Sequence, residues 1–184
     1  MTSNQTARLI GAIFGLAFIM VNAAALPTAV GIPLRVLAIL AFLRLFTMLR
    51  RSRTAQAAAT ATARPSVFGR GYRLVVVAEV AAGVAGLFVL SHVLHTPQAA
   101  VGWIALVVGV HFFGLAAVWR MPSVNRLAAA MSVCGAVGLA LAFADAPRAA
   151  IAAVAGIVPG VLLLASVWWA LREAAAPERP APAA

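Results

Sequence analysis

Six long apolar stretches limit the fold of this chain more than any other feature of its sequence. Each falls within the roughly 17–25 residues that cross a ~30 Å hydrocarbon core as a helix. Only helices or closed barrels satisfy every backbone group in lipid, and barrel strands would alternate in polarity. The sequence therefore predicts an all-α membrane bundle with spans at approximately residues 9–26, 28–49, 74–94, 99–119, 127–144 and 149–171.

The composition leaves no material for a separate soluble domain. Hydrophobic residues make up 64% of the 184 residues and charged residues 10%, whereas a soluble domain has about 45–50% and 25%. We therefore predict one membrane domain over residues 1–184, with six transmembrane helices arranged as three hairpins. A basic loop at residues 50–72 and a disordered Ala/Pro-rich tail at residues 173–184 complete the expected organisation.

The charges predict how the helices are oriented in the membrane. Fourteen arginines, no lysine and four acidic residues give a net charge of +10. Most arginines flank apolar stretches, where they indicate topology and contact with anionic headgroups. We predict a multi-pass membrane protein with both termini and the basic loop cytoplasmic. The expected partners are anionic membrane lipids and not nucleic acid, and a homo- or hetero-oligomer is left open.

Two features of the spans have alternative interpretations. Arg8, the apolar core that follows it and Ala23 to Ala25 resemble a secretion signal, whose cleavage would leave five spans. A second apolar run follows at once, which favours a retained helical hairpin. The hairpins begin alike, at Arg8-Leu9, Arg73-Leu74 and Arg126-Leu127. This pattern suggests a repeat, although topology rules alone would also produce it.

Three ionisable residues lie inside the predicted spans at a common depth. Glu79, His111 and Arg44 fall ~8–14 Å from the cytoplasmic ends of their helices. Ionisable groups at such depth are costly and are functional candidates by default. Glu79 shares a stripe with Ala82 and other small residues, so it is expected to face a neighbouring helix. We predict an intramembrane polar site in which Glu79 contacts His111, Arg44 or both, with snorkelling of Arg44 to headgroups as the alternative.

A second polar group is predicted in the outer half of the membrane, where Trp103 is also expected as an interfacial aromatic residue. Two imidazoles three residues apart, with a carboxylate across the bundle, could bind a divalent metal, but the spacing is not diagnostic and we predict none. His92 and His111 would lie ~14 Å apart along the axis, too far to ligate one haem iron. No cofactor is expected. The outer group comprises Arg35, Asn22, His92, His95 and Asp145.

Small residues recur at helical spacing and predict close helix packing. We interpret them as packing faces within the bundle, with a dimer face as the alternative. Pro159 lies within the last span and is expected to kink it, and Cys134 is a small packing residue without a disulfide partner. The recurring pairs are Gly11 and Gly15, Ala82 and Gly86, Cys134 and Gly138, and Gly156 and Gly160.

One helix carries a resemblance to known proteins. The stretch Val108-Gly109-Val110-His111-Phe112-Phe113-Gly114-Leu115-Ala116 is similar to a helix of small uncharacterised multi-pass membrane proteins of bacteria, many from high-GC actinobacteria. The resemblance implies a bacterial inner-membrane location. It implies no activity and no functional residue.

The sequence contains no nucleophile elbow, phosphate-binding loop, metalloprotease histidine pair or paired carboxylates at catalytic spacing. We therefore predict a non-enzymatic membrane protein that handles a small solute or ion, or that is an accessory subunit of such a system. The alternative is a structural or interaction protein that binds a partner through its basic loop and its glycine-rich helix faces.

Overall fold

The computed structural model describes residues 3–57, 70–119 and 122–175, and every regular element within them is helical. This confirms the all-α class. Two short 3-10 turns, η1 (Ala23–Ala25) and η3 (Pro97–Ala99), lie in connections between helices. Two π-helical turns are η2 (Val89–Val93) and η4 (Ala153–Ile157). The α-helices are α1 (Ser3–Asn22), α2 (Thr28–Ala57), α3 (Arg70–Phe88), α4 (Ala100–Trp119), α5 (Pro122–Phe143), α6 (Arg148–Ala152) and α7 (Val158–Ala175).

Six of the helical segments are long and apolar enough to cross a membrane, so the chain is a multi-pass membrane protein. Each overlaps one predicted span, and α6, η4 and α7 together form the last. The spans are Gln5–Ala25, Thr28–Arg51, Gly71–Val93, Pro97–Val118, Val124–Phe143 and Arg148–Ala174.

The predicted loop at residues 50–72 was too long at both ends. Helix α2 continues to Ala57, and α3 already begins at Arg70. Arg, Ala and Gln are favourable helix formers, so the helix continues after the apolar stretch has ended. The tail also begins later than the predicted residue 173, because α7 includes residues 173–175. Residues 58–69 and 176–184 lie outside the described part of the chain.

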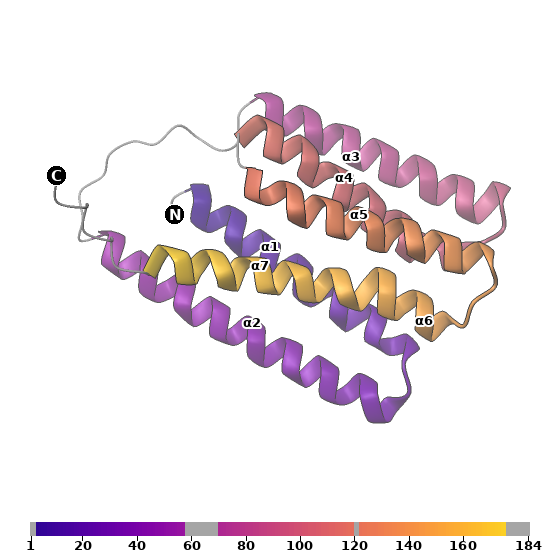
Figure 1. The fold of residues 1–184 in the computed structure, drawn as a ribbon, viewed down its shortest axis with the longest axis horizontal. Coiled ribbons are helices and arrows are strands. Elements are labelled where there is room, and N and C mark those ends of the chain that lie inside the picture. Colours follow the sequence, from indigo (N-terminus) through magenta and orange to yellow (C-terminus); the bar gives the residue numbers. More distant parts are fainter. Residues whose placement is uncertain (1–2, 58–69, 120–121, 176–184) are drawn as a thin grey trace, which may run out of the picture.

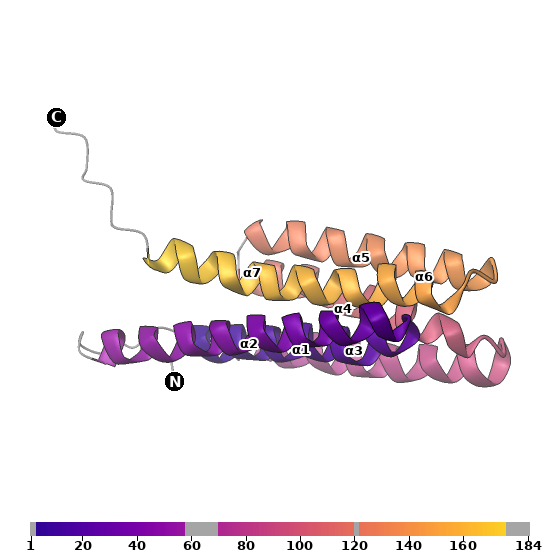
Figure 2. The same cartoon turned by 90° about the horizontal axis from the view of Figure 1, so that it is seen from below.

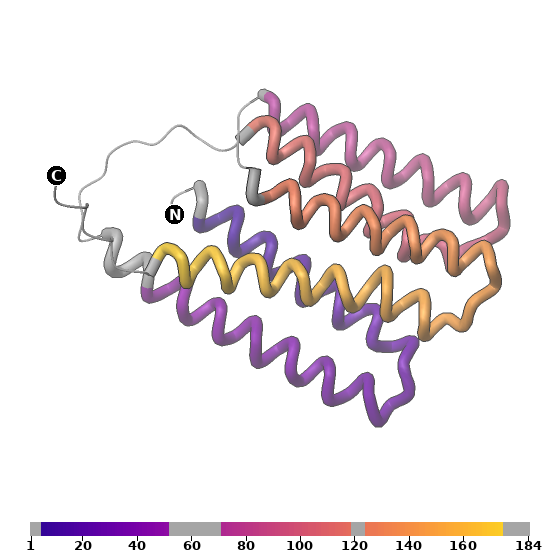
Figure 3. Tube along the Cα trace, in the orientation of Figure 1, coloured from indigo at the N-terminus to yellow at the C-terminus, as the bar shows by residue number. Residues whose placement is uncertain are grey.

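The helices pack in two layers. Figure 2 shows α5, α6 and α7 in one layer and α1, α2 and α3 in the other. The closest helix pairs, α4 with α5 and α1 with α7, join different hairpins. Helix α3 packs mainly on α4, and α2 packs on α1 and α7, so α2 and α3 form opposite edges of the bundle (Figure 1). The three short connections within the hairpins lie together at one end (Figure 3).

Glycines permit the closest helix approaches. A Cβ atom at Gly15 would lie 2.9 Å from the carbonyl oxygen of Gly160, and one at Gly102 would lie 2.6 Å from the backbone nitrogen of Leu139. The former contact joins α1 to α7 and the latter joins α4 to α5. The predicted faces of Gly15 and Gly160 are therefore packing faces within the chain.

Pro159 distorts the last span in the way its chemistry requires. A proline has no N–H to donate to the carbonyl four residues earlier, and its ring would clash with that carbonyl. In the structure the π-helical turn η4 directly precedes α7, and Pro159 is fully buried. Widening one turn relieves the clash without breaking the span.

Candidate functional site

Glu79 of α3 and His111 of α4 face one another inside the bundle. The His111 Nδ1 atom lies 2.9 Å from Glu79 Oε2, and their side chains are 11% and 23% exposed. Glu79 is eight residues from the start of its span and His111 seven from the end of its own, depths of ~12 Å and ~11 Å. The structure thus brings together two ionisable groups at the predicted depth.

The two side chains are in close contact, but their geometry is not that of a hydrogen bond. His111 Nδ1 is buried and has no hydrogen-bond partner of acceptable geometry, so the carboxylate oxygen approaches it away from the N–H direction. The His111 ring also makes an edge contact with Phe112, at 5.7 Å between ring centroids.

The rest of the α3–α4 interface positions this pair. On one side, a Cβ at Gly114 would lie 2.9 Å from the side chain of Val75. On the other side, Trp103 Nε1 lies 3.3 Å from the carbonyl oxygens of both Ala82 and Gly83, to which it donates. The indole covers Gly86, where any Cβ atom would overlap it. Glu79 and His111 therefore lie between the Val75–Gly114 contact and the contacts of Trp103 with α3, which we call the tryptophan clamp.

Sequence reasoning missed this role of Trp103, which we had expected simply at the interface. An antiparallel register with residue 79 opposite residue 111 places residue 103 beside residue 87, one position from Gly86. A large aromatic residue opposite a glycine is the signal that could have found it. Between the two helices the chain turns at His95, which adopts a positive φ of 53°.

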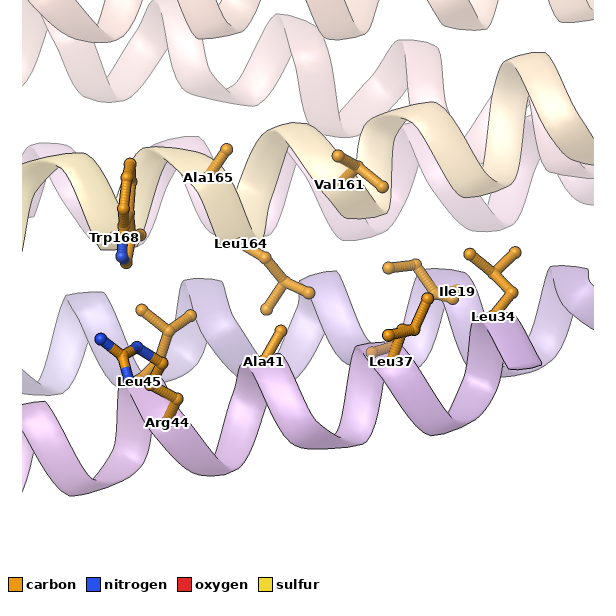
Figure 4. Close-up of a pocket in the computed structure, with 11 residues that line it drawn as sticks. Ile19, Leu34, Leu37, Ala41, Arg44, Leu45, Val161, Leu164, Ala165 and Trp168 are labelled. Carbon is orange, nitrogen blue, oxygen red and sulfur yellow. The ribbon is translucent and has the colours of Figure 1, made fainter. Parts of the chain in front are cut away.

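The predicted contact between Glu79 and Arg44 is wrong. Helices α2 and α3 lie at opposite edges of the bundle (Figure 1). Arg44 is exposed, and its guanidinium lies in a groove between α2 and α7 (Figure 4). Equal depth does not bring two side chains together when other helices lie between them.

The predicted outer polar residues do not form one site. Asn22 Nδ2 donates to the Phe18 carbonyl oxygen at 2.8 Å. His92 stacks on Phe88, with ring centroids 4.7 Å apart, and His95 Nδ1 lies 3.1 Å from the Val93 carbonyl oxygen. Each side chain is thus engaged with its own segment.

Arg35 lines a separate hollow of about 270 Å³ beside η1, and its Nε atom is buried without a hydrogen-bond partner. Asp145 lies in the turn before α6 with a φ of 53°. No hydrogen bond or ion pair joins any two of the five outer residues within the described part of the chain. Within the described part of the chain, no three His, Cys, Asp or Glu side chains lie close enough together to form a metal site.

Comparison of the chain with protein-family models, curated proteins and solved structures finds no match. The functional interpretation therefore rests on the geometry of the helices, above all on the Glu79–His111 contact. The resemblance of residues 108–116, which include His111, to a helix of bacterial multi-pass proteins stays untested.

Proposed function

We propose that the protein moves a small solute or an ion across a bacterial inner membrane, alone or as an accessory subunit of a transport system, and that it is not an enzyme. The observation that supports this proposal is the 2.9 Å contact between Glu79 and His111 inside two apolar spans. Ionisable residues are expensive in a membrane and commonly mark proton relays or ion paths.

The chemistry of the pair suits the binding of a proton or a cation. An imidazole and a carboxylate at contact distance can exist as an ion pair or as two neutral groups, and the transfer of one proton interconverts these states. A cation bound at the carboxylate would displace the imidazolium by direct competition. Because α3 packs mainly on α4, movement of one helix against the other would change the access of water to Glu79.

Reconstitution in liposomes tests this proposal. The wild-type chain, the E79Q variant and the E173Q variant are reconstituted at equal density, and proton entry is followed with a trapped pH-sensitive dye after an imposed pH step. E173Q is the matched control, because Glu173 is exposed and accepts a hydrogen bond from Trp169 Nε1 at 2.7 Å. We expect E79Q to lose at least tenfold in rate and E173Q to retain the wild-type rate.

Two results would contradict the proposal. One is wild-type flux no faster than in empty liposomes, and the other is equal flux through the wild-type and E79Q chains. Cellular abundance of E79Q is measured in parallel, because a transport role predicts unchanged abundance together with lost flux.

The alternative function is that of a structural or interaction protein. It is favoured by the open face of α3, where Gly83 has no atom within 4 Å of the position a Cβ would take. Most other described glycines on the helices contact neighbouring segments of this chain, so a partner would meet α3 rather than a general glycine-rich face. In this case E79Q would lower abundance or the recovery of a homo- or hetero-oligomer, with no flux to lose.

A further inference from the structure

A groove of about 390 Å³ runs between α2 and α7, with α1 as its floor (Figure 4). Its walls are almost entirely aliphatic, and small side chains create the hollow. Ala41 of α2 and Ala165 of α7 are both exposed at its sides. Two apolar helices that approach only through such residues leave room for a slender apolar chain.

The groove has the length of one membrane leaflet. Its lining on α2 extends from Leu34 to Leu45, eleven residues or ~16 Å of helix. This is about half of a ~30 Å hydrocarbon core. Arg44 is sixteen residues from Thr28, where the span begins, and so lies ~24 Å into the core. The groove therefore runs from ~9 Å to ~24 Å into the core and crosses its midplane, with Arg44 at the end nearer the arginine-rich side.

The charge of the groove lining lies at this end. Arg44 is the single charged residue among those that line it. Figure 4 shows the Arg44 guanidinium turned toward Trp168 of α7. A second cation, Arg172, lies over the Trp168 ring at 3.8 Å from its centroid. No carboxylate within the described residues forms an ion pair with Arg44, so its charge is available to an external anion.

We propose that this groove binds an anionic phospholipid, with one acyl chain between α2 and α7 and the phosphate on Arg44. The apolar walls match the chain, and the guanidinium binds the phosphate by charge-assisted hydrogen bonds. Arg44 extends from within the hydrocarbon toward the headgroup level, as long cationic side chains do near helix ends. The lipid is held more specifically than an ordinary boundary lipid, because both its chain and its headgroup are recognised.

Native mass spectrometry of the full chain in detergent tests this assignment. Dioleoylphosphatidylglycerol and dioleoylphosphatidylcholine have the same chains and differ in net headgroup charge, and their binding is titrated separately. We expect the wild-type chain to bind the anionic lipid about tenfold more tightly. R44Q should lose this preference while keeping chain binding, and A165L, which fills the groove, should weaken the binding of both lipids.

Matched variants separate the groove from general effects of charge and size. R35Q removes the same charge from the other half of α2, and A129L adds the same bulk at an exposed position of α5. Both should bind lipid like the wild type. The proposal is overturned if the wild type shows no headgroup preference, if R44Q retains it, if R35Q loses it equally, or if A165L and A129L bind alike.

Discussion

At the scale of single residues, Glu79 is an acidic group placed where a charge is costly. A carboxylate at this depth needs either a partner or a proton, because burial without compensation is strongly unfavourable. His111 supplies the partner at 2.9 Å, and the carboxylate keeps 23% of its side-chain surface exposed. The pair is thus close enough to be coupled and accessible enough to exchange a proton or an ion.

A double-mutant cycle measures this coupling. Removing one member of a fully buried pair costs about 3–5 kcal/mol, whereas polar pairs in membrane proteins average ~0.6 and reach ~1.7 kcal/mol. Because this pair is partly exposed and the His111 N–H does not point at the carboxylate, we expect a coupling energy in the lower of these two ranges. E79Q and H111F should each destabilise the protein in detergent unfolding. The double variant should lose about 1 kcal/mol less stability than the sum of the two single losses.

The second cycle, E79Q with R44L, is the control. Helices α2 and α3 lie at opposite edges of the bundle, so these two effects should add to within about 0.3–0.5 kcal/mol. Additive effects in the first cycle would show that Glu79 and His111 do not interact in solution. Coupling in the control cycle would instead contradict the observed helix order.

At the scale of elements, α3 depends on one neighbour, and Trp103 is its main anchor on α4. The indole donates to two carbonyls of α3 and covers Gly86. One turn earlier on the same helix, Gly83 faces open space. Two glycines three residues apart thus have opposite surroundings, and this contrast tests whether the clamp holds the helix.

We expect G86A to destabilise the protein by about 1–3 kcal/mol, the usual cost of forcing an extra group into a packed interface. The new methyl group would displace the indole from Gly86 and break its bonds to the Ala82 and Gly83 carbonyls. G83A should be neutral or stabilising by up to about 1 kcal/mol, since alanine favours the helix. Thermal unfolding of the two variants in detergent compares them directly, and equal midpoints would refute the clamp.

The individual helices were more predictable than their arrangement. Apolar length alone located all six spans, because lipid requires each helix to satisfy its own backbone. The Glu79–His111 contact could be predicted from the sequence, since a short turn fixes which residues of a hairpin lie opposite one another. Arg44 was misplaced because helix order around the bundle depends on distant glycine contacts, such as Gly15 with Gly160, which no local pattern of charge or hydropathy specifies.

At the scale of the whole molecule, the two ends of the bundle differ in charge. Arg50 and Arg51 lie near the end of α2, Arg73 near the start of α3 and Arg172 near the end of α7. All four belong to the end opposite the three short connections (Figure 3). Arg148 and Asp145 lie at the other end and are opposite in charge. The positive-inside rule counts basic residues near span ends, so this asymmetry predicts the orientation of the bundle.

We expect the arginine-rich end to be cytoplasmic, and cysteine labelling of intact bacterial cells measures this. Cys134 is first replaced by alanine, and single cysteines are then placed at Ala144, beside the connection before α6, and at Ala174, near the end of α7. Both positions are exposed, so differences in labelling report their side of the membrane. An impermeant thiol reagent should label A144C on intact cells, and A174C only after the cells are opened. Labelling of A174C but not A144C on intact cells would invert the orientation and place the Arg44 end of the lipid groove in the outer half of the membrane.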